Sequence, residues 1–218
     1  MLSLSLEKAH TYVLQVLDEL KNSDDMPMLV EAEGLDTYKL TEGNIVEAAL
    51  KAHKDAPSRL IDGIVGTQKV DYSVTFDTDG KVATIVMLQD SARLASLKAS
   101  DSNFVVTNYA DEESTIGRMQ HNEYVRGTYD DPRLIIKKVW TNDRRPEYIY
   151  YCTQGNKATF TVEYVPYFEV MGDSIDICDK MEYAVLTLLA AMVLDALSLH
   201  DKANLYRTRY QEYLQTTR

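Results

Sequence analysis

Hydrophobic residues near the start of the chain recur at the spacing of two helices. In the first pattern Ser5 stands at a capping position and the polar run 22–25 ends the repeat, which predicts an amphipathic helix. A second helix is predicted to open at Thr41 and to stop before Pro57. The apolar positions are Leu6, Ala9, Val13, Leu17 and Leu20 in the first helix, and Ile45, Ala48, Ala49 and Ala52 in the second.

The middle of the chain changes to the alternation that is typical of strands. Apolar and polar residues alternate over 70–76, residues 77–80 form a turn sequence, and 81–88 continues as a second strand. This arrangement predicts a β-hairpin. A short helix over 92–98 and a strand over 104–107 are expected to follow.

The stretch 111–133 is polar and rich in charged residues, and it predicts a long loop with one helical turn. Strand patterns return after it and predict an antiparallel meander. The predicted strands of this meander are 134–140, 148–152 and 158–165.

The last quarter of the chain is predicted to be helical. Asp173, Ser174 and Asp176 supply caps and early negative charge for an apolar helix that runs to Leu199. A second helix, 202–214, carries one apolar stripe. The stripe consists of Ala203, Tyr206, Tyr210 and Tyr213.

This order of elements predicts an α+β fold with N-terminal helices, an antiparallel β-rich middle and a C-terminal helical hairpin. We expect one domain over residues 1–218, with the two termini packed together. Its parts are the N-terminal helices, 1–66, the β-rich middle, 67–170, and the C-terminal helices with a docking tail, 171–218.

The helix that begins at Met181 is apolar on almost every side, since Thr187 is the only polar residue between 183 and 194. A helix of this kind must be covered on several sides. It is either the central core helix of the protein or a helix that packs against both its own subunit and a neighbouring one.

The charge of the chain argues against a protein that binds nucleic acid. There are 34 acidic and 23 basic side chains, a formal charge of −11, whereas nucleic-acid binders cluster Lys and Arg. The formal charge of residues 201–218 is +2 and that of the rest of the chain is −13. This difference indicates a mildly basic tail that is able to dock on a partner. The longest apolar run is too short for a membrane span, which needs roughly 20 residues. Two cysteines are too few for a disulfide framework and favour a reducing compartment.

A search for catalytic and ligand-binding motifs predicts no catalytic residue, no metal site and no cofactor. The four histidines are scattered, and no phosphate-binding loop or nucleophile motif occurs. Residues 77–80 are read as a plain hairpin turn and Gly63–Gly66 as a helix end or turn. Cys178 is read as an inert thiol.

Four segments of the chain resemble the head-to-tail adaptor proteins that form a ring in the neck of tailed bacteriophages. The first two are Ala9–Leu20 and Asn44–His53, and the others are the apolar block Tyr183–Leu199 and the amphipathic block Ala203–Leu214 after it. The resemblance implies a structural virion protein, not an enzyme, that is assembled in the bacterial cytoplasm. It implies a homo-oligomeric ring, usually twelvefold, beneath the portal protein, through which DNA passes without specific binding.

The resemblance also implies where partners bind. The C-terminal segment would reach the portal and the β-rich middle would meet other neck or tail proteins. Candidate interface residues are Tyr206, Arg207, Arg209, Tyr210, Tyr213 and Leu214 in the tail, and Arg144 and Arg145 at a turn.

A different class of function stays open beside this one. The chain would then be a small-molecule-binding or enzymatic α+β domain with its site in the 111–133 loop. The candidates for acid–base work are His121, Glu123, Asp130 and Asp131. A third possibility is another part of the phage neck, such as a tail completion protein.

Overall fold

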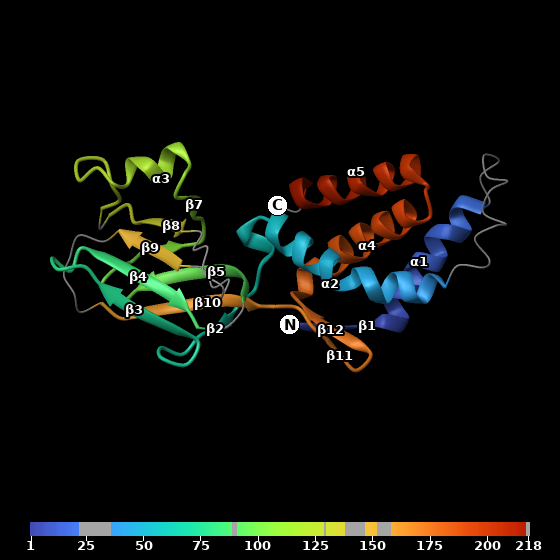
Figure 1. Cartoon of the computed structure of the whole chain (residues 1–218), viewed down its shortest axis with the longest axis horizontal. Coiled ribbons are helices and arrows are strands. Elements are labelled where there is room, and N and C mark those ends of the chain that lie inside the picture. Colours follow the sequence, from blue (N-terminus) through green and yellow to red (C-terminus); the bar gives the residue numbers. More distant parts are fainter. Residues whose placement is uncertain (22–35, 89–90, 129, 138–146, 152–157, 217–218) are drawn as a thin grey trace. The chain divides into compact units, whose positions relative to one another are not determined.

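The computed structural model confirms the α+β class and the C-terminal helical pair. It describes residues 1–21, 36–88, 91–128, 130–137, 147–151 and 158–216. The chain divides into two compact units, coloured along the sequence in Figure 1. Unit 1 consists of Met1–Ile61 and Phe168–Arg218, and unit 2 of Asp62–Tyr167. The expectation of a single domain stays a prediction.

Side chains cap the first two helices of unit 1. Ser5 Oγ accepts a hydrogen bond from Lys8 N (3.1 Å), which opens α1 as predicted. The prediction that the second helix opens at Thr41 was wrong, because Asp36 Oδ1 accepts from Lys39 N (3.2 Å) and α2 begins at Thr37. The bounds are α1 Leu6–Lys21, α2 Thr37–Asp55, α4 Glu182–Ala196 and α5 His200–Thr216, with short 3-10 turns at Ser58–Leu60 and Asp179–Met181.

Helix α4 is the core of unit 1. Every residue from 184 to 191 is buried, and α1, α2 and α5 all pack against this helix. Its apolar surface is therefore covered within the unit, which supports the first of the two explanations for its composition. No helix in the described part of the chain has the length and apolarity that a membrane crossing requires.

A small sheet joins the N-terminal strand to the segment that precedes the C-terminal helices. Strand β1 (Leu2–Ser5) pairs antiparallel with β12 (Ser174–Ile177), which also pairs with β11 (Val170–Met171). The prediction that Asp173, Ser174 and Asp176 cap a helix was wrong, because two of these residues lie in β12. The expected packing of the termini is confirmed within unit 1.

Unit 2 contains a five-stranded sheet in the order β3-β4-β9-β8-β7. The predicted hairpin is confirmed, and Gly80 lies in its turn with φ of +68°. Strand β7 pairs parallel with β8, whereas the other neighbours are antiparallel. The strands are β3 Tyr72–Phe76, β4 Val82–Met87, β9 Glu147–Tyr151, β8 Arg133–Lys137 and β7 Ala110–Asp111.

The second sheet of unit 2 has the order β2-β10-β5-β6 and corrects three predictions. Residues 92–98 lie in strand β5 and not in a helix. The expected meander ends at β9, because β10 pairs with β5 and β2. The residues between Gly63 and Gly66 form strand β2 and not the expected helix end or turn. The strands are β2 Ile64–Val65, β10 Phe160–Pro166, β5 Ser91–Ala99 and β6 Val105–Val106.

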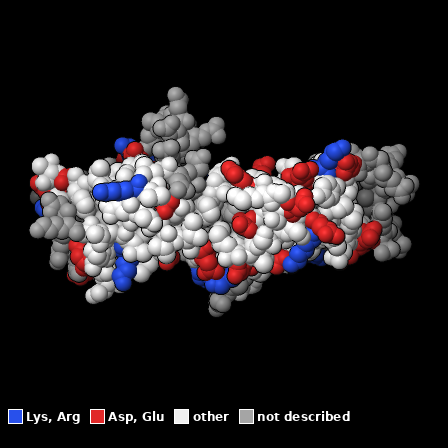
Figure 2. Space-filling view, turned by 90° about the horizontal axis from the view of Figure 1, so that it is seen from below, with Lys and Arg blue, Asp and Glu red and all other residues white. Residues whose placement is uncertain are grey.

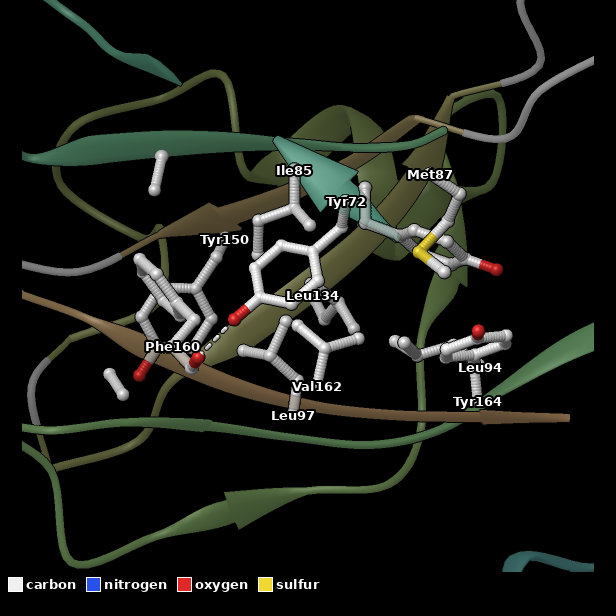
Figure 3. Close-up of a cluster of buried hydrophobic side chains, with 13 residues drawn as sticks. Tyr72, Ile85, Met87, Leu94, Leu97, Leu134, Tyr150, Phe160, Val162 and Tyr164 are labelled. Carbon is white, nitrogen blue, oxygen red and sulfur yellow. Dashed lines mark hydrogen bonds between the residues drawn. The ribbon is translucent and has the colours of Figure 1, made fainter. Parts of the chain in front are cut away.

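The core of unit 2 lies between its two sheets (Figure 3). Tyr72 of β3 crosses this layer and donates a hydrogen bond from its hydroxyl to the carbonyl oxygen of Phe160 in β10. Burial also raises the pKa of Tyr148 well above its ordinary value. The labelled side chains in this layer are Tyr72, Ile85, Met87, Leu94, Leu97, Leu134, Tyr150, Phe160, Val162 and Tyr164.

Candidate docking surface beside helix α3

The predicted loop 111–133 is folded around a short helix, α3 (Thr115–Met119). Ser114 caps this helix, since its Oγ accepts from Gly117 N (3.1 Å) and donates to the Asp111 carbonyl oxygen (2.6 Å). A Cβ at Gly117 would collide with that same carbonyl oxygen. Glycine therefore allows α3 to lie directly against the end of β7.

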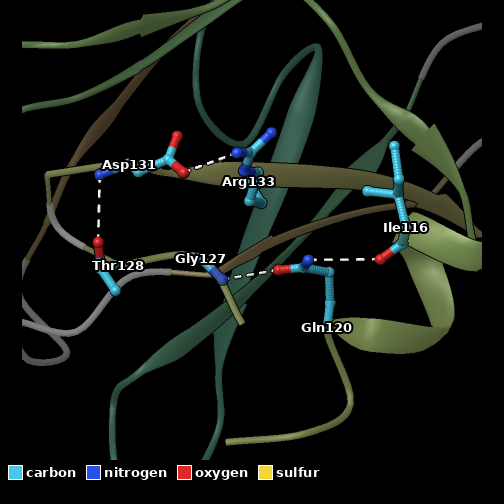
Figure 4. A network of polar contacts seen from close by, with 6 residues as sticks. All are labelled: Ile116, Gln120, Gly127, Thr128, Asp131 and Arg133. Carbon is cyan, nitrogen blue, oxygen red and sulfur yellow. Dashed lines mark hydrogen bonds and ion pairs between the residues drawn. The ribbon is translucent and has the colours of Figure 1, made fainter. Parts of the chain in front are cut away.

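The side chain of Gln120 fixes the segment that follows α3 (Figure 4). Gln120 is 5% exposed, donates from Nε2 to the Ile116 carbonyl oxygen (3.3 Å) and accepts at Oε1 from Gly127 N (2.6 Å). Further along, Asp131 N donates to Thr128 Oγ1 (3.2 Å). These bonds hold the segment as a defined structure and not as an open loop.

A pocket of about 380 Å³ lies beside α3. Residues 104–110, Ile116, Gln120 and residues 130–135 line it. A second pocket of about 260 Å³ shares Ile116 and is lined also by Met119 and Val125. Ile116 therefore stands between two hollows of the same surface.

Exposed apolar side chains gather around these pockets and form what we call the α3 surface. They are between 46% and 54% exposed, although the residues around them in the sequence are mostly polar. The α3 surface consists of Phe104, Val105, Ile116, Met119 and Val125. A cluster of large apolar side chains held open to solvent by a fixed scaffold is typical of a protein docking site.

The four acid–base candidates of this loop are not brought together. Asp130 and Asp131 line the larger pocket, but His121 and Glu123 line neither pocket. Asp131 is paired with Arg133 (2.6 Å), and His121 Nε2 lies 3.7 Å from Glu112 Oε1. Among the described residues no group of His, Cys, Asp and Glu is arranged to hold a metal ion.

Three of the predicted interface residues on α5 are buried in unit 1. Tyr206, Tyr210 and Leu214 face the other helices, and the Tyr210 hydroxyl donates to Asp55 Oδ2 (3.1 Å). Arg59 Nη2 donates to the Leu214 carbonyl oxygen (3.0 Å). These three residues could contact a partner only if α5 detached from the other helices of unit 1.

The other predicted interface residues of α5 lie nearer the solvent. Arg207 forms an ion pair with Asp195, and the guanidinium of Arg209 lies 4.8 Å from the centre of the Tyr206 ring. The Tyr213 hydroxyl donates to the Lys180 carbonyl oxygen (2.7 Å). The turn candidates Arg144 and Arg145 lie outside the described residues.

The sequence interpretation did not identify the α3 surface. Its signal was present as apolar residues placed within a polar stretch, but without the fold their exposure could not be known. Comparison of the chain with protein-family models, with curated proteins and with solved structures finds no match.

Proposed function

We propose that this protein is a structural virion component that forms a ring in the neck of a tailed phage. The ring would connect the portal to the tail and let DNA pass through its centre. The α3 surface is the observation that supports this function best, because it offers contacts for a protein partner.

The size of the exposed side chains supports docking over catalysis. Large apolar and aromatic residues are the ones that anchor protein interfaces, and they are rarely left open to water in a cluster without a partner. The α3 surface is bordered by the charged residues Arg118, Arg126 and Asp130, as the polar rim of an interface is.

The distribution of charge supports passage of DNA without binding. Unit 1 contains 19 acidic and 11 basic residues, so it carries −8 of the net charge of −11. On the face drawn in Figure 2, acidic side chains outnumber basic ones over unit 1. Acidic walls repel phosphate within a Debye length of about 8–10 Å. Unit 1 is therefore the part that we place beside the DNA.

The portal would meet the exposed side of α5. Arg207, Arg209 and Tyr213 are partly or fully accessible there, whereas the buried side of the helix is held by Tyr210 and Leu214. A docking event that orders this segment further would allow ring closure to follow DNA packaging.

The test is the mass of the assembly. Purified protein is measured by mass photometry and negative-stain imaging, alone and mixed with candidate portal proteins. We expect rings in the mixture. Arg209→Glu, at an exposed position of α5, should weaken portal binding. Lys54→Glu, at an exposed position of α2, is the matched control. A chain that stays monomeric with every neck protein would contradict the proposal.

The alternative function, a small-molecule-binding or enzymatic domain, is favoured by the pocket that Asp130 and Asp131 line. If it is correct, Asp130→Ala abolishes turnover or ligand binding and leaves assembly intact.

The third possibility is another part of the phage neck, such as a tail completion protein. The identity of the neighbouring genes would distinguish it from a portal adaptor.

A further inference from the structure

The imidazole ring of His53 is buried in unit 1, and the proposed function makes no use of it. It belongs to α2 and has 0% of its surface exposed. Both ring nitrogens have hydrogen-bond partners on the main chain. Nδ1 lies 2.8 Å from the carbonyl oxygen of Ala49, one turn back on the same helix. Nε2 accepts a hydrogen bond from the backbone N–H of Cys178 (3.2 Å).

These two partners determine which nitrogen of the ring carries the hydrogen. A carbonyl oxygen can only accept, so Nδ1 carries a hydrogen, and a backbone N–H can only donate, so Nε2 carries none. The ring is therefore neutral, in the Nδ1–H tautomer. A second proton on Nε2 would set a donor against the N–H of Cys178, break that bond and leave a charge in the interior.

Cys178 lies at the point where the C-terminal helices begin. It follows strand β12 and directly precedes the 3-10 turn Asp179–Met181, which leads into α4. The ring of Phe168 also packs against His53, with 4.5 Å between the two ring centres. His53 therefore joins α2 to both ends of the segment 168–178, which contains β11 and β12.

The interior around His53 is largely apolar. The buried residues of α1 and α4, the helices that pack against α2, are apolar except for Thr187. The Cys178 thiol is buried, and a buried thiol is neutral in the acid range. From α5, Tyr210 donates its hydroxyl to Asp55 (3.1 Å). The charged residues closest in sequence to the ring and its partners are all exposed: Lys54, Asp55, Glu169, Asp176, Asp179 and Lys180.

We propose that His53 is an acid-sensitive switch that holds the segment 168–178 to α2 while the ring is neutral and releases it when the ring is protonated. A histidine that is open to water titrates near pH 6.5. Opening of the segment therefore takes up a proton below about pH 6.5, and the equilibrium constant for opening rises by up to about tenfold for each pH unit below that value. The switch is independent of the proposed function.

The wild-type chain allows two direct measurements. Long-range proton–nitrogen NMR spectra of the histidine rings should show His53 neutral with its hydrogen on Nδ1 at pH 7, whereas the exposed rings of His121 and His200 titrate freely. Hydrogen exchange of the Cys178 amide, corrected for the intrinsic rate, should accelerate from pH 6.5 to pH 5. At pH 5 this amide should exchange at least tenfold faster than the amide of Leu189 in the core of unit 1.

Three results on the wild type would each overturn the switch. The first is a His53 ring that is charged at pH 7 or has its hydrogen on Nε2. The second is protection of the Cys178 amide that does not change with pH. The third is equal exchange of Cys178 and Leu189 at pH 5, because the segment would then open only with the whole unit.

A matched pair of variants separates His53 from the other histidines. Gln in His53→Gln can accept from the Cys178 N–H but cannot be charged, so the acceleration below pH 6.5 should disappear. His121→Gln, at an exposed position, should keep it. Circular dichroism shows whether each variant is folded, and the wild-type spectra decide the question if His53→Gln is not. An unchanged acceleration in His53→Gln would refute the switch, and none of these readouts involves assembly or the portal.

Discussion

At the scale of single residues, the hydroxyl of Tyr72 is a polar link between the two sheets of unit 2. It lies in an apolar layer and donates to the Phe160 carbonyl oxygen. Tyr72→Phe removes the donor while keeping the ring, and we expect it to lower the free energy of unfolding by about 1 kcal/mol. Urea denaturation measures this loss. Tyr124→Phe, at a 95% exposed position, is the control, and an equal loss in both variants would contradict the role of the hydrogen bond.

Tyr210 predicts how the stability of unit 1 depends on alkaline pH. Burial, and next the charge of Asp55, raise the pKa of Tyr210 above its ordinary value of 10.0. The unfolded chain then loses this proton before the folded chain does, so the stabilisation is complete below pH 10 and is lost as the pH rises toward the folded pKa. We expect the free energy of unfolding to fall above pH 10, and less steeply in Tyr210→Phe. Denaturation at a series of pH values checks this, and an unchanged slope in the variant would refute it.

At the scale of elements, two glycines in helices predict opposite effects of the same substitution. Gly43 in α2 has nothing near its missing Cβ, so Gly43→Ala should stabilise the protein by about 0.5–1 kcal/mol through helix propensity. Gly117→Ala should destabilise it, because the new Cβ meets the Asp111 and Glu112 carbonyl oxygens. Thermal unfolding of the two variants shows whether each substitution stabilises or destabilises the protein. A stabilising Gly117→Ala would show that α3 is free to move away from β7.

The elements that could be predicted from sequence are those whose pattern is local. The periodicity of α1, the turn at Gly80 and the continuous apolar run of α4 each determine their own structure. Strand β5 could not be predicted, because residues 92–98 include good helix formers and become a strand only through pairing with β10. Strand β12 likewise depends on β1, which lies at the other end of the chain.

The candidate site was only partly predictable for the same reason. The segment 111–133 was recognised as a long loop with a helical turn, and α3 confirms that turn. Its exposed apolar residues could not be separated from core residues, since exposure depends on where β7 and Gln120 hold the segment. On α5 the tyrosines at helical spacing mark a buried face, so Tyr206 and Tyr210 pack inward in the described structure.

At the scale of the whole molecule, each unit has its own core and its own hydrogen bonds, which predicts that the two open separately. Tyr72→Phe weakens unit 2, and Ala191→Leu overfills the core around α4 in unit 1 at a cost of about 1–3 kcal/mol. We expect native-state hydrogen exchange to accelerate in 62–167 for the first variant, and in 1–61 and 168–218 for the second. A single cooperative domain, as the sequence predicts, would instead accelerate exchange in both units with either variant. The exchange pattern therefore decides between one domain and two, since the two substitutions perturb cores that share no residue.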